Sequence, residues 1–189
     1  MYETIAIHVV RRSGVRVTAL TNVGLVLLGS VVIALLAQVR VALPFSAVPL
    51  TGQTLGVLLV AAALGWKRGV ACLMTYLAEG ALGLPVFAGG AAGFAYLGGV
   101  TGGYLLGFVV AAAVVGGLAE RGWDRRWYGV AAMFALGMMA IYACGAAYLS
   151  TFVGLRQALL MGVLPFLGVD VLKAAVAAVL LPLAWKLTR

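Results

Sequence analysis

Two residues of opposite charge, Asp170 and Lys173, lie near the start of the last long apolar segment of the sequence. They are three positions apart, so on an α-helix they share one face and partly neutralise each other. A charge in the middle of a membrane helix costs about 2.5–3.5 kcal/mol on insertion scales, and less toward an interface. A carboxylate accepts from N–H groups and an ammonium donates to carbonyl or carboxylate oxygens, each bond contributing about 1.5–3 kcal/mol. The pair therefore indicates a binding site for a small ligand that carries both kinds of polar group.

The alternative is an ion pair that only holds helices together, and two irregular segments of the sequence favour the binding site instead. The first, residues 39–53, contains two prolines, and the second, residues 83–104, is rich in glycine and carries no charge. Non-helical backbone at membrane depth persists only where protein buries it or where it lines a cavity. We therefore expect the two segments to cover a cavity that has the charge pair at its floor.

Further candidates for the cavity wall lie on or beside these two segments. They are Thr51 and Gln53 on the first, and Phe87, Tyr96 and Tyr104 on the second. Each has a structural alternative. Gln53 could instead cap the following helix, Phe87 could plug the loop, and the two tyrosines could be aromatic residues of a membrane interface.

The elements that must position these residues are apolar helices. The chain is 65% hydrophobic and only 10% charged, with five acidic residues, whereas soluble domains contain about 25% charged residues. Its apolar residues form long runs between short polar breaks, without the alternation of a transmembrane β-barrel. We therefore predict a single membrane-embedded domain over residues 1–189, of the all-α class and polytopic, with six transmembrane helices.

The predicted transmembrane helices follow a short polar lead-in. This lead-in, residues 1–16, carries three arginines and is a candidate for a short helix on the membrane surface. The six predicted spans are residues 17–39, 53–65, 69–82, 102–119, 129–150 and 168–187.

Lysine and arginine positions orient the predicted bundle. If the N-terminus lies inside, only Arg40 and Arg156 fall on the outer side, and Lys173 lies within a span. By the positive-inside rule, both termini are then cytoplasmic, and the two irregular segments share the outer face of a multi-pass protein of the cytoplasmic (inner) membrane. The other ten of the thirteen basic residues fall on the inner side: Arg11, Arg12, Arg16, Lys67, Arg68, Arg121, Arg125, Arg126, Lys186 and Arg189.

Several other functions are disfavoured by the sequence. The net charge of +8 comes from short basic clusters between apolar runs, so membrane topology explains it better than nucleic-acid binding. Cys72 and Cys144 are isolated, and the single histidine, His8, lies outside the spans, so no metal-binding set is expected. A membrane-embedded transferase would need several acids or a nucleophile with a base, but only Asp170 and Glu79 lie at depth. We expect no catalytic residue, no enzyme activity and no ATP site, because the sequence has no GxxxxGK[ST] motif.

Two small residues on the first span, Ser30 and Ala34, are four positions apart. Small-xxx-small spacing allows helices to approach closely within lipid. The spacing fits docking either to a neighbouring helix of the chain or to a separate membrane subunit.

Three stretches of the sequence, taken together and in this order, carry a family resemblance. They are VPLTGQTLGVLL at residues 48–59, GLPVFAGG followed by GG.TGGYLLGF within residues 83–108, and PF...D..KA at residues 165–174. The chain resembles the BioY family, the biotin-specific S components of energy-coupling factor (ECF) vitamin transporters. The resemblance extends from the first span to the last.

The resemblance implies a six-helix S-component-like bundle that captures biotin from the outside, beneath the first and third loops. Asp170 and Lys173 match the D-x-x-K pair of the family, which contacts the ureido bicycle of biotin. The glycine-rich loop would contribute Gly89 and Gly103, which offer only backbone groups. Two departures stand out, because Val100 replaces a proline of the family pattern and Glu79 occupies an apolar position.

The resemblance also implies partners. The expected function is biotin uptake by a substrate-binding subunit without a cofactor, coupled to a transmembrane T component and paired ATPases, although some members work without this energising module. Ser30 and Ala34 resemble the positions that dock on the T component. An S component for a different vitamin remains the alternative within the same class.

Overall fold

Nearly all regular structure of the chain is helical in the computed structural model, which describes residues 2–44, 46 and 48–188. Arg189, one of the ten basic residues assigned above to the cytoplasmic side, lies outside the described residues. The elements, in chain order, are α1 (Ile5–Arg12), α2 (Ala19–Gln38), β1 (Arg40–Val41), β2 (Leu50–Thr51), α3 (Gln53–Leu64), α4 (Trp66–Ala81), α5 (Phe94–Leu97), α6 (Gly102–Ala119), the 3-10 helix η1 (Trp123–Arg125), α7 (Trp127–Val153), α8 (Leu155–Gly162) and α9 (Leu164–Leu187).

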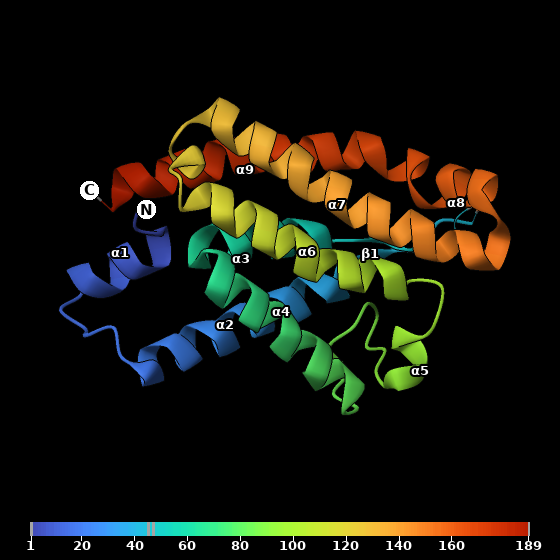
Figure 1. Cartoon of the computed structure of the whole chain (residues 1–189), viewed down its shortest axis with the longest axis horizontal. Coiled ribbons are helices and arrows are strands. Elements are labelled where there is room, and N and C mark those ends of the chain that lie inside the picture. The colour runs from blue at the N-terminus through green and yellow to red at the C-terminus, as the bar shows by residue number, and fades with distance from the viewer. Residues whose placement is uncertain (1, 45, 47, 189) are drawn as a thin grey trace.

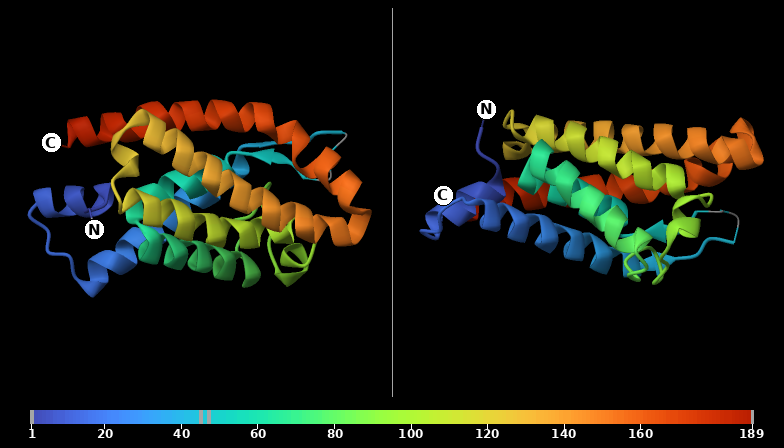
Figure 2. Two further views of the ribbon diagram at one scale, coloured as in Figure 1. Left: turned by 45° about the horizontal axis from the view of Figure 1, so that its top comes forward. Right: turned by 60° about the horizontal axis from the view of Figure 1, so that its bottom comes forward.

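The helices form an elongated bundle with two distinct ends. Figure 1 shows the long helices running along the long axis, with the N- and C-termini at one end. Both views in Figure 2 repeat this arrangement and place the β1–β2 ribbon at the opposite end. We call the end that carries α1 and η1 the terminus end, and the end that carries the ribbon, α5 and α8 the cavity end.

The predicted all-α class is confirmed, and α2, α3, α4, α6, α7 and α9 occupy the six predicted spans. Four stretches of the described chain are long and apolar enough to cross a membrane, namely α2, α6, α7 and Leu155–Leu187. Helix α3 is apolar but has only 12 residues, and α4 has 16. The chain is therefore a multi-pass membrane protein, whereas six crossings and cytoplasmic termini stay predictions.

Glycines with positive φ set element boundaries that the apolar pattern did not reveal. Gly65, with φ of 82°, separates α3 from α4, so α4 begins at Trp66 rather than at residue 69. Gly154, with φ of 81°, ends α7 and starts α8, a helix that was not predicted. A side chain is strained in this left-handed region, whereas glycine adopts it readily. Helix α9 then begins four residues before position 168, with Pro165 in its first turn, where proline is tolerated.

Helix α6 lies at the core of the bundle and packs against α3, α4 and α7. Its glycines permit close helix contact, as expected for packing within lipid. A Cβ on Gly107 would lie 2.9 Å from the Cα of Ile141 in α7, and one on Gly116 would lie 2.5 Å from the backbone of Gly65. These distances leave no room for a larger residue, so α6 fixes the positions of its neighbours.

The lead-in forms a helix, α1, that packs on the end of the bundle. Ile5 and Ile7 are buried, while Arg11 is exposed. His8 Nε2 lies 3.0 Å from the carbonyl oxygen of Thr188, just after α9. The expected short helix therefore exists, and it contacts the C-terminal end of the chain.

Candidate functional site

A cavity opens at the cavity end between α3, α6, α7 and α9, and the β2 strand and the α4–α6 loop (residues 82–101) also contribute to it. It contains about 540 Å³ of empty space, including the space at its mouth that is open to solvent. Apolar side chains form much of the wall, among them Leu105, Phe108, Ile141 and Phe166. Both charged residues of the predicted pair line it as well.

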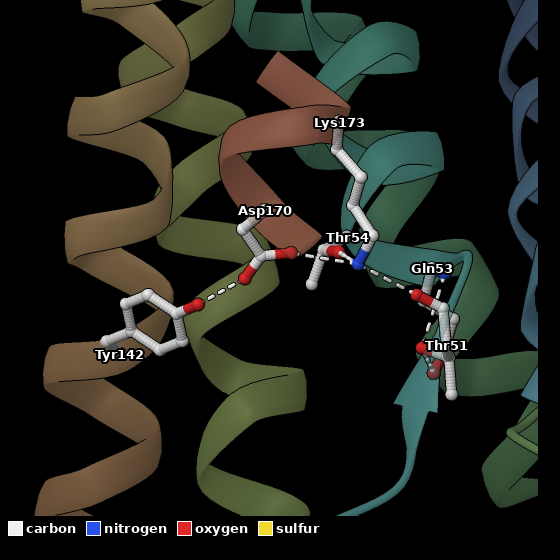
Figure 3. Close-up of polar contacts among 6 residues, drawn as sticks. All are labelled: Thr51, Gln53, Thr54, Tyr142, Asp170 and Lys173. Carbon is white, nitrogen blue, oxygen red and sulfur yellow. Dashed lines mark hydrogen bonds and ion pairs between the residues drawn. The ribbon is translucent and has the colours of Figure 1, made fainter. Parts of the chain in front are cut away.

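The ammonium group of Lys173 donates to three protein acceptors (Figure 3). Nζ lies 2.8 Å from Asp170 Oδ1, 3.0 Å from the carbonyl oxygen of Thr51 and 2.7 Å from Thr54 Oγ1. A lysine ammonium has three N–H donors, so these partners use all of them. A ligand acceptor would therefore have to take the place of one of these oxygens.

The carboxylate of Asp170 is bonded on both oxygens but keeps free acceptor capacity. Oδ1 accepts from Lys173, and Oδ2 accepts from the phenol of Tyr142 in α7. An ionised carboxylate can accept about four hydrogen bonds, so two donors do not saturate it. The side chain is only 8% exposed, and it lies in the cavity wall. Asp170 can thus accept additional N–H groups from a ligand without losing its protein partners.

Thr51 and Gln53 line the cavity and begin a chain of hydrogen bonds that leads to the α4–α6 loop. Thr51 Oγ1 donates to Gln53 Oε1 at 3.1 Å, and Gln53 Nε2 donates to the phenol of Tyr76 at 2.7 Å. The Tyr76 phenol donates in turn to the carbonyl oxygen of Val86 at 2.9 Å. Gln53 therefore does not cap α3 with its side chain, and it couples the first irregular segment to the second.

The two predicted tyrosines also belong to the cavity wall. Tyr104, from the first turn of α6, donates its phenol proton to the carbonyl oxygen of Gly162 at 2.9 Å. Tyr96, from α5, stacks on Phe87 with ring centroids 5.1 Å apart. Both residues therefore line the cavity from the glycine-rich side, and their contact with a ligand stays a prediction.

Among the residues that the structure describes, three predicted site residues do not line the cavity: Phe87, Gly89 and Gly103. Phe87 is fully buried and packs against Tyr76 and Tyr96, so it plugs the loop. Gly89 adopts φ of 71°, and a Cβ at this position would lie 2.5 Å from Nη1 of Arg40. A Cβ on Gly103 would lie 2.2 Å from the Cβ of Tyr148, so this glycine serves helix packing.

Two residues that contact the charge pair, Thr54 and Tyr142, were not predicted from the sequence. Thr54 directly follows the first irregular segment, in the first turn of α3, so the polar start of an otherwise apolar helix was an available signal. Tyr142 lies in the middle of α7, and only the packing of α7 on α9 brings it to Asp170.

Ser30 occupies an internal position rather than a docking surface. It is fully buried, and its hydroxyl lies 3.0 Å from Glu79 Oε1 in α4 and 2.9 Å from the carbonyl oxygen of Leu27. The small-residue spacing had two interpretations, and at Ser30 it allows contact with a neighbouring helix of the same chain. The contact also gives Glu79 a partner, whereas Ala34 is half-buried beside the exposed face of α2.

Comparisons with known proteins agree on the family. A family model described as the BioY family matches residues 10–189. A "Biotin transporter BioY" of Thermotoga maritima is 41% identical over 141 residues, which are 74% of this chain and 82% of that protein. Another, of Rhizobium etli, is 36% identical over 163 residues, covering 82% and 87% of the two chains.

A solved structure has the same fold. It is a crystal structure of "the S-component for biotin from an ECF-type ABC transporter", with a TM-score of 0.81 and 24% identity, covering 90% of this chain and 95% of that one. At this identity the likeness concerns the fold, and the assignment rests on the family model and the relatives. The chain belongs to the BioY family.

Proposed function

We propose that this chain binds biotin in the cavity and acts as the substrate-binding subunit, or S component, of an ECF transporter for biotin uptake. The observation that carries the proposal is a buried carboxylate paired with a partly buried ammonium in the wall of an otherwise largely apolar cavity. Membership of a family whose relatives are named biotin transporters supports it. The protein is accordingly a transport protein and not an enzyme.

The geometry of the charge pair matches the polar groups of biotin. The ureido ring has two N–H donors and a carbonyl acceptor on one rigid unit, and the valerate chain ends in a carboxylate. The ureido N–H groups bind the spare acceptor sites of Asp170, and Lys173 donates to a biotin oxygen in exchange for Thr51 or Thr54. Each bond to a charged group contributes about 1.5–3 kcal/mol.

The apolar part of the cavity accommodates the rest of the ligand. Phe108, Ile141 and Phe166 supply hydrophobic contact for the sulfur-containing ring and the aliphatic chain. Burial of such a surface contributes about 25 cal/mol per Å². The polar pair then sets orientation and specificity, while the apolar wall adds affinity.

The proposed orientation and partners follow from the ends of the bundle. The cavity end faces outward and the terminus end, with most basic residues, faces the cytoplasm across the inner membrane. A transmembrane T component and paired ATPases supply the energy, and the exposed apolar face of α2 beside Ala34 is where the T component docks.

Isothermal titration calorimetry of the purified protein with biotin tests the proposal. We expect a Kd below about 1 μM, which corresponds to about −8.2 kcal/mol. Asp170→Asn should weaken binding strongly, whereas Asp124→Asn, at the other buried aspartate, should leave it unchanged. Absence of biotin binding, or displacement of biotin by a different vitamin at lower concentration, would refute biotin as the substrate. Equal affinity of wild type and Asp170→Asn would return the charge pair to a structural role.

A further inference from the structure

A second, strongly basic pocket lies at the terminus end. It is bounded by Tyr2, the turn between α6 and α7, and the first turns of α7, and it encloses about 1180 Å³ including its open mouth. Three arginines line it, Arg121, Arg125 and Arg126, and none of the other described lining residues is acidic. The proposed biotin site does not use this pocket.

The two nearby acids, Asp124 and Glu120, each bond through one oxygen to a group outside the pocket. Asp124 is buried, and its Oδ2 accepts from the indole N–H of Trp185 at 2.6 Å. Glu120 Oε1 accepts from the backbone N–H of Trp66 at 3.1 Å. Ion pairs among the described residues involve Glu3 and Asp170, so none of the three arginines takes part in one. With three arginines and no acidic residue among its described lining residues, the pocket has an excess of positive charge.

The pocket is an ordered part of the fold. The Arg125 guanidinium lies between two aromatic rings, 4.5 Å from the centroid of Tyr2 and 4.6 Å from that of Trp185. The backbone N–H of Tyr2 donates to the carbonyl oxygen of Glu120 at 2.7 Å. Gly122 has φ of 86° and brings its backbone against the Tyr2 ring. These contacts hold Arg125 in a fixed position in the wall, while Arg121 and Arg126 are exposed at its mouth.

The surroundings of the pocket are those of a membrane interface. Trp127 is 68% exposed and Tyr128 is 51% exposed at the start of α7, and Arg126 donates to the phenol of Tyr128. Exposed apolar residues such as Leu136 and Met139 follow along α7. Tryptophan and tyrosine gather at the headgroup level of a bilayer. The pocket therefore lies where the polar heads of lipids meet the protein.

We propose that this pocket binds the phosphate of an anionic phospholipid headgroup. Guanidinium groups form paired hydrogen bonds with phosphate oxygens, and basic pockets beside membrane helices on the cytoplasmic side attract anionic lipids. The exposed apolar surface along α7 lies alongside the acyl chains of the bound lipid. A soluble anion would gain the charge contacts but not this apolar contact.

Native mass spectrometry of the full chain in detergent, with added phosphatidylglycerol or phosphatidylcholine, tests the proposal. We expect phosphatidylglycerol to be retained about tenfold more than phosphatidylcholine, and Arg121→Gln/Arg126→Gln to lose about tenfold of this retention. The matched control is Arg16→Gln/Lys67→Gln, which removes the same charge from exposed residues at the same end and should keep retention within about twofold. Unchanged melting temperatures would show that both variants fold.

Three outcomes would overturn the proposal. If both double variants lost phosphatidylglycerol retention equally, general surface charge rather than this pocket would hold the lipid. Equal retention of phosphatidylglycerol and phosphatidylcholine would mean that the pocket does not recognise an anionic headgroup. Displacement of phosphatidylglycerol by millimolar inorganic phosphate would make the pocket a site for a soluble anion. An added acidic peptide that competes fully with the lipid would identify an acidic protein as the ligand.

Discussion

The two ends of the bundle treat buried charge differently. At the cavity end, both oxygens of Asp170 and all three N–H groups of Lys173 have protein partners, and open space lies beside them. At the terminus end, Asp124 and Glu120 each keep one buried oxygen without a partner among the described residues, and Arg125 stacks on aromatic rings. A charge pair with adjoining apolar space thus suits a small polar ligand, whereas arginines without an ion-pair partner among the described residues suit an anionic group from outside the chain.

The largest effect that would sharpen this comparison comes from Lys173→Ala. It removes a donor to the ligand and leaves the Asp170 carboxylate buried without its cation. We expect biotin binding to weaken by about 100-fold or more, equivalent to about 3 kcal/mol. Lys186→Ala removes an exposed lysine near the other end and should leave the affinity unchanged by calorimetry. A similar loss in both variants would break the distinction between the two ends.

Added volume at close contacts should have the next largest effect. A Cβ in Gly80→Ala would lie 2.0 Å from the ring of Phe87, and one in Gly116→Ala would lie 2.5 Å from the backbone between α3 and α4. Overpacking of this kind costs about 1–3 kcal/mol, so both variants should melt at lower temperature. Only Gly80→Ala should also weaken biotin binding, because Phe87 supports Tyr96.

Gly24→Ala is the control for these two variants. Nothing lies within 4 Å of a Cβ at this position in α2, so its melting temperature should not fall. If Gly116→Ala impaired biotin binding as much as Gly80→Ala did, the two ends would be coupled.

Removal of single donors to the buried aspartates should have smaller effects. Tyr142→Phe deletes the hydroxyl that donates to Asp170, and Trp185→Phe deletes the indole N–H that donates to Asp124. A hydrogen bond contributes about 0.5–1.5 kcal/mol, so Tyr142→Phe should weaken biotin binding about three- to tenfold in titration calorimetry. Trp185→Phe should lower the melting temperature but leave biotin affinity intact. The reverse pattern would contradict the assignment of the site.

The smallest expected effect concerns the pH dependence of stability at the terminus end. Burial raises the pKa of the Asp124 carboxyl above its ordinary value, although the Trp185 hydrogen bond and the charge of Arg125 oppose this shift. The folded state then binds the proton more tightly than the unfolded state, so this residue's stabilising contribution is greatest below the unfolded-state pKa. That contribution declines as the pH rises through the folded-state pKa.

Asp124→Asn tests this pH dependence with a side chain that is always neutral. It should melt at a slightly higher temperature than wild type at neutral pH, and the difference should vanish in acid. Thermal unfolding between pH 4 and pH 8 measures this, with Asp170→Asn as the comparison at the cavity end. A destabilised Asp124→Asn at neutral pH would mean that the ionised carboxylate stabilises its surroundings.

The part of the site that could be predicted from sequence depends on local spacing. Asp170 and Lys173 share a helical face whatever the packing of the helices. Thr51 and Gln53 lie at the start of a predicted helix, beside an irregular segment that was expected to cover the cavity. Tyr142 could not be found in this way, because its role depends on how far α7 is rotated against α9.

The fold shows the same limit. Long apolar runs predicted the main helices, but α8 depends on the conformation of Gly154, which a hydrophobic pattern does not record. Phe87 was predicted at the site because its segment was expected to cover a cavity, and Gly89 because the family resemblance implied it. Only the tertiary structure shows which residues of that loop line the cavity, such as Tyr96, and which are buried within the loop, such as Phe87.

The close packing of α6 on α7 has a consequence for how a substrate gets in and out. Gly103 and Gly107 bring the two backbones together so closely that neither helix can slide or tilt without steric overlap. We therefore expect the part of the cavity wall formed by α6 and α7 to stay rigid. Any opening of the cavity is then expected at the β1–β2 ribbon, which has only two residues in each strand, or at the α4–α6 loop, which carries no charged side chain. Spin labels placed on those two segments should report the motion, while a pair on α6 and α7 should stay at constant separation.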